Sequence, residues 1–124
     1  MDTDLKSFVL AYFDRLNKHD LDGYYDLFAE DIVYTGASES RGIAEARAAN
    51  ELFFQNVPDH WRRVERMLVD GDMVVVWLTL GGTPRANGVP FEVEVCSVLE
   101  VRDGKVQSVR MYTDWPDLVS KLGA

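Results

Sequence analysis

The segment Phe91–Ser97 has the sequence FEVEVCS, in which apolar and charged side chains alternate over most of its length. Neighbouring residues of a β-strand point to opposite faces of a sheet, so this alternation separates two faces. One face carries Phe91, Val93, Val95 and Ser97, and the other carries Glu92, Glu94 and Cys96. A sheet with one dry face must bury that face against a second layer. The segment therefore predicts a strand whose inner side forms part of a core.

Turn residues divide the chain around this segment into further strands. Asp70-Gly71 and Asp103-Gly104 are dipeptides typical of tight hairpins, and a longer loop is expected at Gly81–Gly88. Strands joined by hairpins are antiparallel. The pattern predicts four of them, at about Trp61–Val69, Met73–Leu80, Val89–Val101 and Lys105–Trp115.

The first half of the chain shows helical periodicity instead. An apolar stripe recurring every three or four residues predicts a helix from about Asp4 to Lys18. The stripe consists of Leu5, Phe8, Val9, Tyr12, Phe13 and Leu16. Asp20 is a good N-cap for a second, shorter helix. A short strand, Ile32–Thr35, then leads through a polar loop, Gly36–Gly42, into a third helix that ends before Pro58.

Length and composition describe one ordinary globular domain. The chain has 124 residues, of which 47% are hydrophobic and 27% are charged, so residues 1–124 are expected to form a single domain. Thirteen Lys and Arg against 21 Asp and Glu give a formal net charge of -8. Charge repulsion then disfavours nucleic acids and anionic membranes as partners. The expected partner is a small hydrophobic molecule or a second copy of the chain.

Cysteine and histidine usage argues against disulfides, metals and cofactors. Cys96 is the single cysteine, and His19 and His60 belong to no cluster with metal-ligand spacing. No segment is apolar enough to span a membrane, and Asp2 and Asp4 stand where a signal peptide would need basic residues. We therefore expect a protein of the reducing cytoplasm that uses neither a metal nor a cofactor.

Helices followed by hairpin-linked strands indicate an α+β architecture. We expect a curved antiparallel sheet that is covered on one face by three N-terminal helices. A long sheet that curls around helices leaves a cavity between the two layers. A mostly apolar pocket with a few polar groups is expected in that cavity.

Four segments resemble the nuclear transport factor 2-like superfamily, which includes the SnoaL-like polyketide cyclases, the ketosteroid isomerases and the limonene epoxide hydrolases. They are Tyr12–Asp31 (YFDRLNKHDLDGYYDLFAED), Val57–Gly71 (VPDHWRRVERMLVDG), Asp72–Gly82 and Asp103–Trp115 (DGKVQSVRMYTDW). The order of elements also resembles that superfamily, so the resemblance covers essentially the whole chain. It implies one SnoaL-like domain, a cone-shaped fold around a deep apolar pocket, and a homodimer formed through the outer face of the sheet.

The resemblance also implies roles for particular residues. Tyr12 precedes Asn17–Gly23 (NKHDLDG), in the place where ketosteroid isomerases carry the tyrosine of their oxyanion hole. Their general base falls on Gly36, their second oxyanion acid falls on or near Ser97, and the last-strand aspartate of the cyclases and epoxide hydrolases falls on Met111. Tyr12 and Ser97 are therefore the expected hydroxyl donors. The alternative for Tyr12 is a core aromatic residue whose hydroxyl is satisfied.

Glu65 and Glu39 are the candidates for the missing acid or base. With regular strand alternation Glu65 shares a face with Trp61 and Met67, and burial there would raise the pKa of its carboxyl toward neutrality. The alternative is an ion-paired surface position, because three arginines surround Glu65. Glu39 follows the first strand and would reach the cavity mouth. Its alternative is a position that faces water.

Aromatic and apolar residues on the expected elements are candidates for the cavity wall. They are Tyr34, Phe54, Trp61, Trp77, Val95, Val109 and Met111. Such a wall suits a flat hydrophobic ligand, and plain core packing is the alternative for each residue. His60, at a strand start, is either a proton shuttle or an incidental rim residue. Asp114 is expected to have a structural or dimer role, and Cys96 is expected to be unreactive.

Two functional hypotheses of different classes follow, with a third behind them. The first is a cofactor-independent enzyme that acts on a small hydrophobic, carbonyl-bearing substrate by proton transfer, as an isomerase, a cyclase or a dehydratase-type lyase. Tyr12 and Ser97 would polarise the carbonyl, and Glu65 or Glu39 would move the proton. The alternative is a non-catalytic module that binds an apolar ligand or dimerises, which Gly36 at the base position favours. Epoxide hydrolysis is the third.

Overall fold

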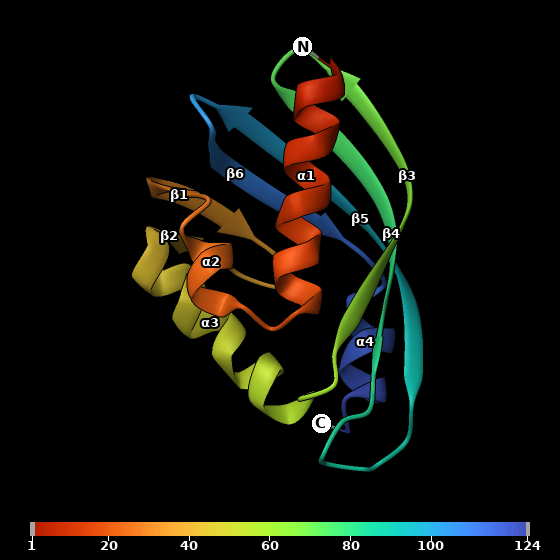
Figure 1. Cartoon of the computed structure of the whole chain (residues 1–124). Helices are drawn as coiled ribbons and strands as arrows, with labels where there is room; N and C mark the ends of the chain where they lie inside the picture. Colours follow the sequence, from red (N-terminus) through yellow and green to blue (C-terminus); the bar gives the residue numbers. More distant parts are fainter. Residues whose placement is uncertain (1, 124) are drawn as a thin grey trace.

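A computed structural model describes residues 2–123 of the chain, with side chains from residue 4 onward (Figure 1). Helices and strands occupy most of this range. The helices are α1 (Asp2–Asn17), α2 (Leu21–Tyr25), α3 (Ile43–Asn56) and α4 (Trp115–Lys121). The strands are β1 (Phe28–Thr35), β2 (Glu39–Arg41), β3 (Trp61–Asp70), β4 (Met73–Gly82), β5 (Phe91–Arg102) and β6 (Lys105–Tyr112).

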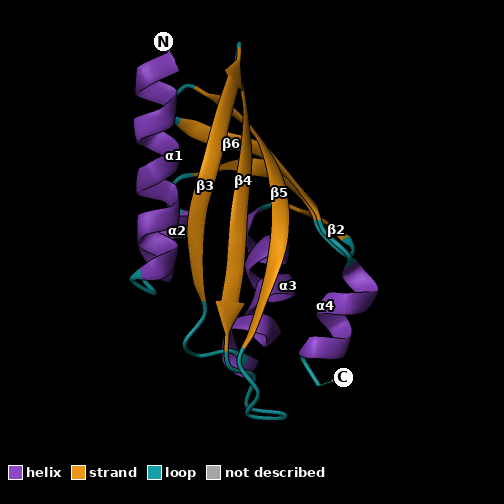
Figure 2. Ribbon diagram, turned by 90° about the vertical axis from the view of Figure 1, so that its right-hand side faces the viewer, coloured by secondary structure: helices purple, strands orange, loops and turns teal. Residues whose placement is uncertain are grey.

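The strands form one sheet in the order β2-β1-β6-β5-β4-β3. Neighbouring strands are antiparallel except β1 and β6, which run parallel. β3, β4 and β5 are long and bend together, and the helices lie on the concave side of this bend (Figures 1 and 2). The predicted α+β class, with a curved and mainly antiparallel sheet and three N-terminal helices, is confirmed.

α1 forms on the apolar stripe that the sequence predicts. Its fully buried residues, each at most 4% exposed, are Val9, Tyr12, Phe13 and Leu16. They pack against the concave side, where α1 contacts β3 and β4. Asp20 caps α2 as predicted, because its carboxylate accepts a hydrogen bond from the backbone N–H of Gly23 at 3.0 Å. Burial of the apolar stripe therefore holds α1 against the sheet, and the Asp20 cap defines the start of α2.

β5 shows the alternation expected from its sequence. Its buried residues are Phe91, Val93, Val95, Ser97, Leu99 and Val101. Glu92 and Glu94 are exposed on the opposite face. Ser97 lies beside Met111 of β6 in the register of the sheet. The dry face of β5 is therefore the concave face, and a serine lies within it.

β3 contains a β-bulge that changes which side chains face inward. Its register with β4 slips by one residue between Val64 and Arg66, which leaves Glu65 as an extra residue on β3. Side chains face the concave side at Arg62 and Val64 before the bulge and at Met67 after it. Glu65 points outward and does not share a face with Met67. The regular alternation assumed from the sequence is therefore wrong at this point.

Two further elements differ from the sequence expectation. The polar loop Gly36–Gly42 contains β2, which forms a hairpin with β1. The last strand ends at Tyr112 rather than at Trp115, because Asp114 begins α4. The Asp114 carboxylate accepts a hydrogen bond from the backbone N–H of Asp117 at 3.1 Å, and a proline occupies the first turn. Asp114 has a structural role as this cap.

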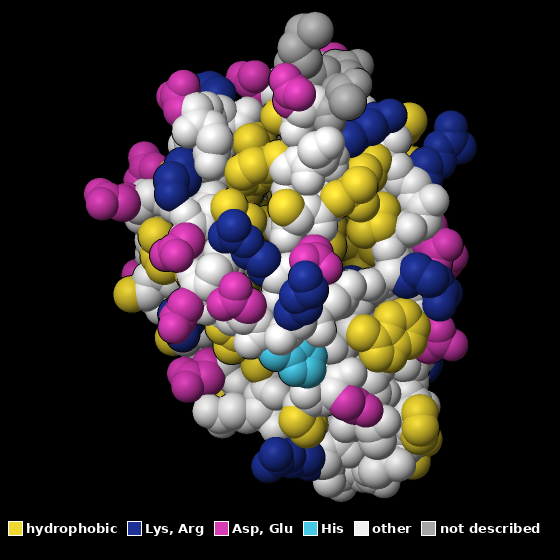
Figure 3. Space-filling view, viewed as in Figure 1, with side chains coloured by type: hydrophobic (Ala, Val, Ile, Leu, Met, Phe, Trp, Pro, Cys, Tyr) yellow, Lys and Arg dark blue, Asp and Glu magenta, His cyan; other side chains and the backbone are white. Residues whose placement is uncertain are grey.

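The surface carries charges of both signs. On the face shown in Figure 3, acidic and basic side chains are intermixed around α1, α2 and α3. Within residues 2–123, no helix combines the length and the apolar character needed to cross a membrane.

Asp114→Ala is expected to lower the free energy of unfolding by about 1 kcal/mol, because the N-cap acceptor of α4 is lost. Asp114→Asn keeps an acceptor at the same position and is the matched control, expected to retain wild-type stability. Urea denaturation followed by circular dichroism measures both variants. Equal stability of Asp114→Ala and wild type would show that this cap does not hold α4.

Candidate functional site

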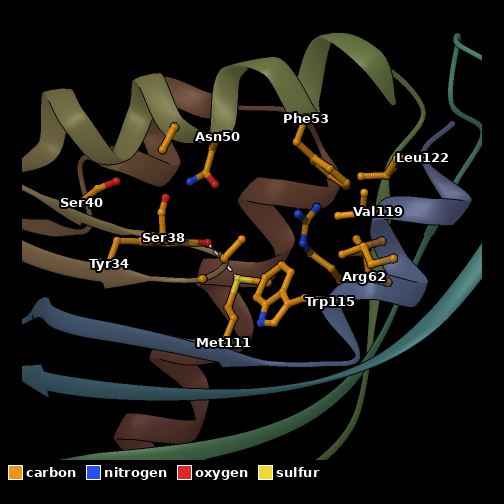
Figure 4. Close-up of a pocket in the computed structure, with 15 residues that line it drawn as sticks. Tyr34, Ser38, Ser40, Asn50, Phe53, Arg62, Met111, Trp115, Val119 and Leu122 are labelled. Atoms are coloured by element: carbon orange, nitrogen blue, oxygen red, sulfur yellow. Dashed lines mark hydrogen bonds between the residues drawn. The ribbon is translucent and has the colours of Figure 1, made fainter. Parts of the chain in front are cut away.

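A cavity of about 230 Å³ opens between α3, α4 and the concave side of the sheet (Figure 4). Most of its wall is apolar, with Phe53 of α3 facing Trp115 and Val119 of α4. The polar side chains on the wall are Tyr34, Ser38, Ser40, Asn50 and Arg62. A concave apolar space with a few polar groups is the usual form of a small-molecule site.

A smaller hollow of about 20 Å³ adjoins this cavity toward the core. Tyr34, Arg62, Leu80 and Met111 line both spaces. Other residues around the hollow are Tyr12, Tyr24, Phe54 and Ser97. Its volume suits one water molecule or one oxygen atom of a ligand. The inner end of the site is therefore a group of hydroxyls beside a cation.

The tyrosine hydroxyls at this hollow are hydrogen-bonded and protonated. The hydroxyl oxygens of Tyr12 and Tyr24 share a hydrogen bond at 2.7 Å, and the Tyr34 hydroxyl donates to Met111 Sδ at 3.1 Å. Burial raises the pKa of Tyr12 and Tyr24 well above its ordinary value, and it also raises the pKa of Tyr34. At neutral pH each of the three hydroxyls keeps its proton; Tyr34 donates to Met111, one of Tyr12 and Tyr24 donates to the other, and the second of that pair keeps a free donor.

Arg62 is the charged residue of the site. β3 brings it to the concave side, and Figure 4 shows its guanidinium between Phe53 and Val119. Nη1 of Arg62 donates to Nδ1 of His60 at 2.7 Å. The guanidinium carbon lies 5.8 Å from the ring centre of Phe53 and 5.9 Å from that of Phe54. At such distances aromatic rings attract a cation.

His60 holds the guanidinium of Arg62 in place. Its imidazole is 3% exposed and stacks on the rings of His19 at 4.3 Å and Phe54 at 4.7 Å. A guanidinium only donates, so Nδ1 of His60 accepts and the other ring nitrogen carries the hydrogen. Burial lowers the pKa of His60 to about 3, and the charge of Arg62 adds to the effect. The imidazole is therefore neutral near pH 7.

Among the described side chains, residues 4–123, no carboxylate lines the site. No Asp or Glu of this range lies on the wall of the cavity or of the hollow, and none forms an ion pair with Arg62. Within the same range, no three His, Cys, Asp or Glu side chains are grouped to hold a metal ion. The site can donate hydrogen bonds and accommodate negative charge, but these residues offer no carboxylate base.

Several residues named from the sequence meet at the site. Tyr12, Phe54 and Ser97 line the hollow, and Tyr34 and Met111 line both spaces. Gly36 also lies on the wall of the cavity. Tyr12 is packed among aromatic rings, lines the hollow and shares a hydrogen bond with the Tyr24 hydroxyl. Core packing and hydrogen-bond donation are thus compatible for this residue.

The two glutamates predicted as acid or base lie outside the site. Glu65 is on the outer face of the sheet, where Arg63 donates to its carboxylate at 2.7 Å. That hydrogen bond lowers the pKa of Glu65, which is the opposite of the predicted rise. Glu39 is exposed in β2 and pairs with Arg41 at 3.1 Å. Both glutamates therefore occupy ion-paired surface positions rather than positions in the cavity.

Four of the predicted wall residues also lie elsewhere. Trp77 is 45% exposed on the outer side of β4, because the inner positions of this strand are its even-numbered residues from Val74 to Leu80. The Trp61 ring lies 5.5 Å from the guanidinium carbon of Arg63, away from both spaces. Val95 and Val109 face inward but are buried in the core and line neither space.

Arg62, Asn50 and the residues of α4 contribute to the site without having been identified from the sequence. Arg62 stands beside Arg63, Glu65 and Arg66, which together have the composition of a solvated ion-pair face. Its spacing of two residues from the apolar Val64 could have identified Arg62 as inward-facing, since both side chains lie on the same face before the bulge. For α4, the signal was an Asp followed closely by a Pro, which is typical of a helix start.

Residues 9–109 match the SnoaL-like domain family. The chain belongs to this family. No curated protein matches this SnoaL-like domain in sequence. Among solved structures, it is similar to a protein described as a SnoaL-like polyketide cyclase from Jannaschia sp. CCS1, with 25% identity and a TM-score of 0.82 over 98% of this chain and 93% of that chain.

Two further solved structures share the fold of this SnoaL-like domain. AclR from Streptomyces galilaeus, described as a hydroxylase, has 22% identity and a TM-score of 0.85 over 98% of this chain and 96% of its own. A protein with a ketosteroid isomerase-like fold from Catenulispora acidiphila was solved with trimethylamine. It has 18% identity and a TM-score of 0.83 over 94% of this chain and 92% of its own. The nuclear transport factor 2-like fold implied by the sequence is confirmed, in a family that includes small-molecule-processing enzymes.

His60→Asn is expected to make the stability of the domain less sensitive to acid. Asn offers an acceptor near the position of Nδ1 but does not titrate. Between pH 6.5 and about pH 3 the unfolded wild-type chain binds a proton at His60 that the folded chain does not bind, so stability falls as the pH falls. Urea unfolding at pH 7.5 and pH 5 should show wild type losing about 2 kcal/mol more than the variant. Equal losses would show that the folded imidazole titrates normally.

Proposed function

We propose that this SnoaL-like domain is a cofactor-independent enzyme that acts on a small hydrophobic, carbonyl-bearing substrate by proton transfer, as an isomerase, cyclase or dehydratase. The observation that carries the proposal is the hollow at the inner end of an apolar cavity, which is lined by three hydroxyl-bearing residues, Tyr12, Tyr24 and Ser97. Fixed donors in a site with little water stabilise a developing oxyanion much better than water does.

In the proposed reaction the substrate carbonyl oxygen occupies the hollow and its apolar body occupies the cavity. A C–H bond next to the carbonyl breaks, its electron pair moves onto the carbonyl oxygen, and the enolate accepts hydrogen bonds there. Because Tyr12 and Tyr24 already share a hydrogen bond at 2.7 Å, one hydroxyl strengthens the donation of the other. Return of a proton to a different carbon completes an isomerisation.

The proton acceptor in this proposal is water that enters the cavity, since Glu65 and Glu39 lie outside it. Water is a weak base, so the site suits a substrate whose C–H bond is already acidic, such as one between two carbonyl groups. The chain then contributes mainly by lowering the energy of the enolate. This assignment keeps the hydroxyl donors expected from the sequence and replaces the expected glutamate.

The alternative function is a non-catalytic module that holds a ligand in the same cavity. It is favoured by Gly36 and Met111, on which the resemblance puts the family's base and acid positions and which both line the cavity. Epoxide hydrolysis ranks third, because it needs a carboxylate to activate water and none of the described side chains supplies one there.

Tyr12→Phe is expected to reduce catalysed enolisation by a factor on the order of 10², because one oxyanion donor is removed. The measurement is the exchange of the carbon-bound protons next to the carbonyl of 2-tetralone in D₂O, followed by proton NMR with and without protein. Tyr112→Phe is the matched control, since Tyr112 is 55% exposed on the outer face of the sheet and lines neither space. Unaccelerated exchange in the wild type would favour the binding module.

We also propose that the domain is a homodimer formed through the outer face of the sheet. Four large apolar side chains are exposed there: Leu68 (45%), Met73 (44%), Trp77 (45%) and Tyr112 (55%). They come from β3, β4 and β6, so together they span most of the outer face. A patch of this kind marks an interaction site more often than a free surface.

Trp77→Glu is expected to convert the dimer into a monomer, because a charge would be buried at the centre of the apolar patch. Light scattering after size-exclusion chromatography measures the molecular mass. Val89→Glu is the control, since Val89 is 59% exposed in the loop before β5 and outside the patch. A monomeric wild type, or a dimeric Trp77→Glu variant, would exclude this interface.

A further inference from the structure

We propose that Arg62 is the anion-binding residue of the cavity, and that the substrate is a hydrophobic keto acid whose carboxylate binds the Nε and Nη2 donors of this guanidinium. His60 is the positioning residue of Arg62 in this arrangement. The inference rests on the proposed function, because it assumes that the cavity receives the substrate, and it adds a second recognition group beside the carbonyl.

The hydrogen bonds of Arg62 leave one edge of its guanidinium available. Nη1 is engaged by Nδ1 of His60 at 2.7 Å. Nε and Nη2 form the opposite edge of the planar group, and no described residue accepts a hydrogen bond from either atom. Two parallel N–H donors on one edge match the two oxygens of a carboxylate.

The charge of Arg62 also lacks a partner within the described side chains, residues 4–123. Four other arginines of this range form an ion pair with a surface carboxylate and four do not, but Arg62 is the one described arginine that lines the cavity. The chain has 21 Asp and Glu residues, yet no ion pair in the described range reaches the partly buried Arg62. Among the described residues no buried side-chain donor lacks a partner, so the free N–H groups of Arg62 are open to the cavity, where an anion supplied by the ligand can pair with them.

The surroundings of Arg62 preserve its charge and its position. Burial lowers the pKa of Arg62, but a guanidinium remains charged at neutral pH. Phe53 and Phe54 lie close enough to attract the cation without neutralising it. His60 is neutral near pH 7, so it accepts from Nη1 and adds no second positive charge. The result is one fixed cation facing an apolar cavity.

The position of Arg62 also limits the distance between the carboxylate and the carbonyl of the substrate. Arg62 lines both the cavity and the hollow, whereas Tyr12 and Ser97 line only the hollow. A carboxylate on Arg62 and a carbonyl oxygen in the hollow must then be close together within one molecule. This geometry favours a keto acid whose two oxygen groups are separated by a few atoms, with the rest of the molecule apolar.

The test compares 2-naphthoate with 2-naphthamide, which has a similar shape and no charge. Binding of each to the full chain is measured by isothermal titration calorimetry at pH 7.5. Wild type is expected to bind 2-naphthoate about tenfold or more tightly than 2-naphthamide, since a bidentate contact to a charge is lost in the amide. Arg62→Met should abolish this ratio while still binding 2-naphthamide. Arg63→Met, a neighbour on the outer face, should keep the ratio.

His60 variants test the positioning role separately. His60→Leu, which removes the acceptor for Nη1, should lower the naphthoate-to-naphthamide ratio several-fold, and His60→Asn, which keeps an acceptor, should restore most of it. A purely structural effect would weaken both ligands alike and leave the ratio unchanged. That result would overturn the role of His60.

Other outcomes separate this inference from the proposed function. Equal affinity for the two ligands, an unchanged ratio in Arg62→Met, or no binding of either ligand would overturn the anion site. If Tyr12-dependent exchange of 2-tetralone persisted in any of these cases, the proposed function would stand without the inference. An Arg62-dependent ratio without catalysed exchange would support the anion site in a protein that binds its ligand without converting it.

Discussion

The concave face of the sheet is apolar along its length, and covering it is the constraint that arranges the molecule. β4 and β5 extend over 10 and 12 residues and present Val and Leu side chains on that face. α1 packs on β3 and β4, whereas α3 and α4 approach the other part of the face without closing it. The cavity is the space left between them. Its apolar wall is therefore a continuation of the core.

Polar chemistry enters this apolar space at a few positions, and each depends on a local feature of the backbone. The bulge at Glu65 separates an inward Arg62 from the outward charges that follow it. His60, buried and neutral, fixes the guanidinium through Nδ1. The tyrosines are placed by helix burial, and their raised pKa keeps them as donors. One cation and several hydroxyls thus face a cavity without carboxylates among the described side chains, an arrangement suited to oxygen anions.

The sequence predicts the parts of this structure that follow from periodicity. The stripe containing Tyr12 and the alternation containing Ser97 predicted that both residues face the core, and the resemblance to the nuclear transport factor 2-like superfamily named them as hydroxyl donors. Trp77 was misplaced because both faces of β4 are apolar in MVVVWLTL, so alternation does not select the inner one. The inward position on β3 was assigned to Glu65 rather than to Arg62, because the bulge depends on pairing with another strand, which local sequence does not specify.

The central claim is that the inner end of the cavity binds a negatively charged oxygen. A crystal structure of the protein with 2-naphthoate tests it most directly. The account predicts carboxylate oxygens about 3 Å from Nε and Nη2 of Arg62, with the naphthalene rings between α3 and α4. A naphthoate whose carboxylate points into solvent, or which binds on the outer face of the sheet, would contradict it.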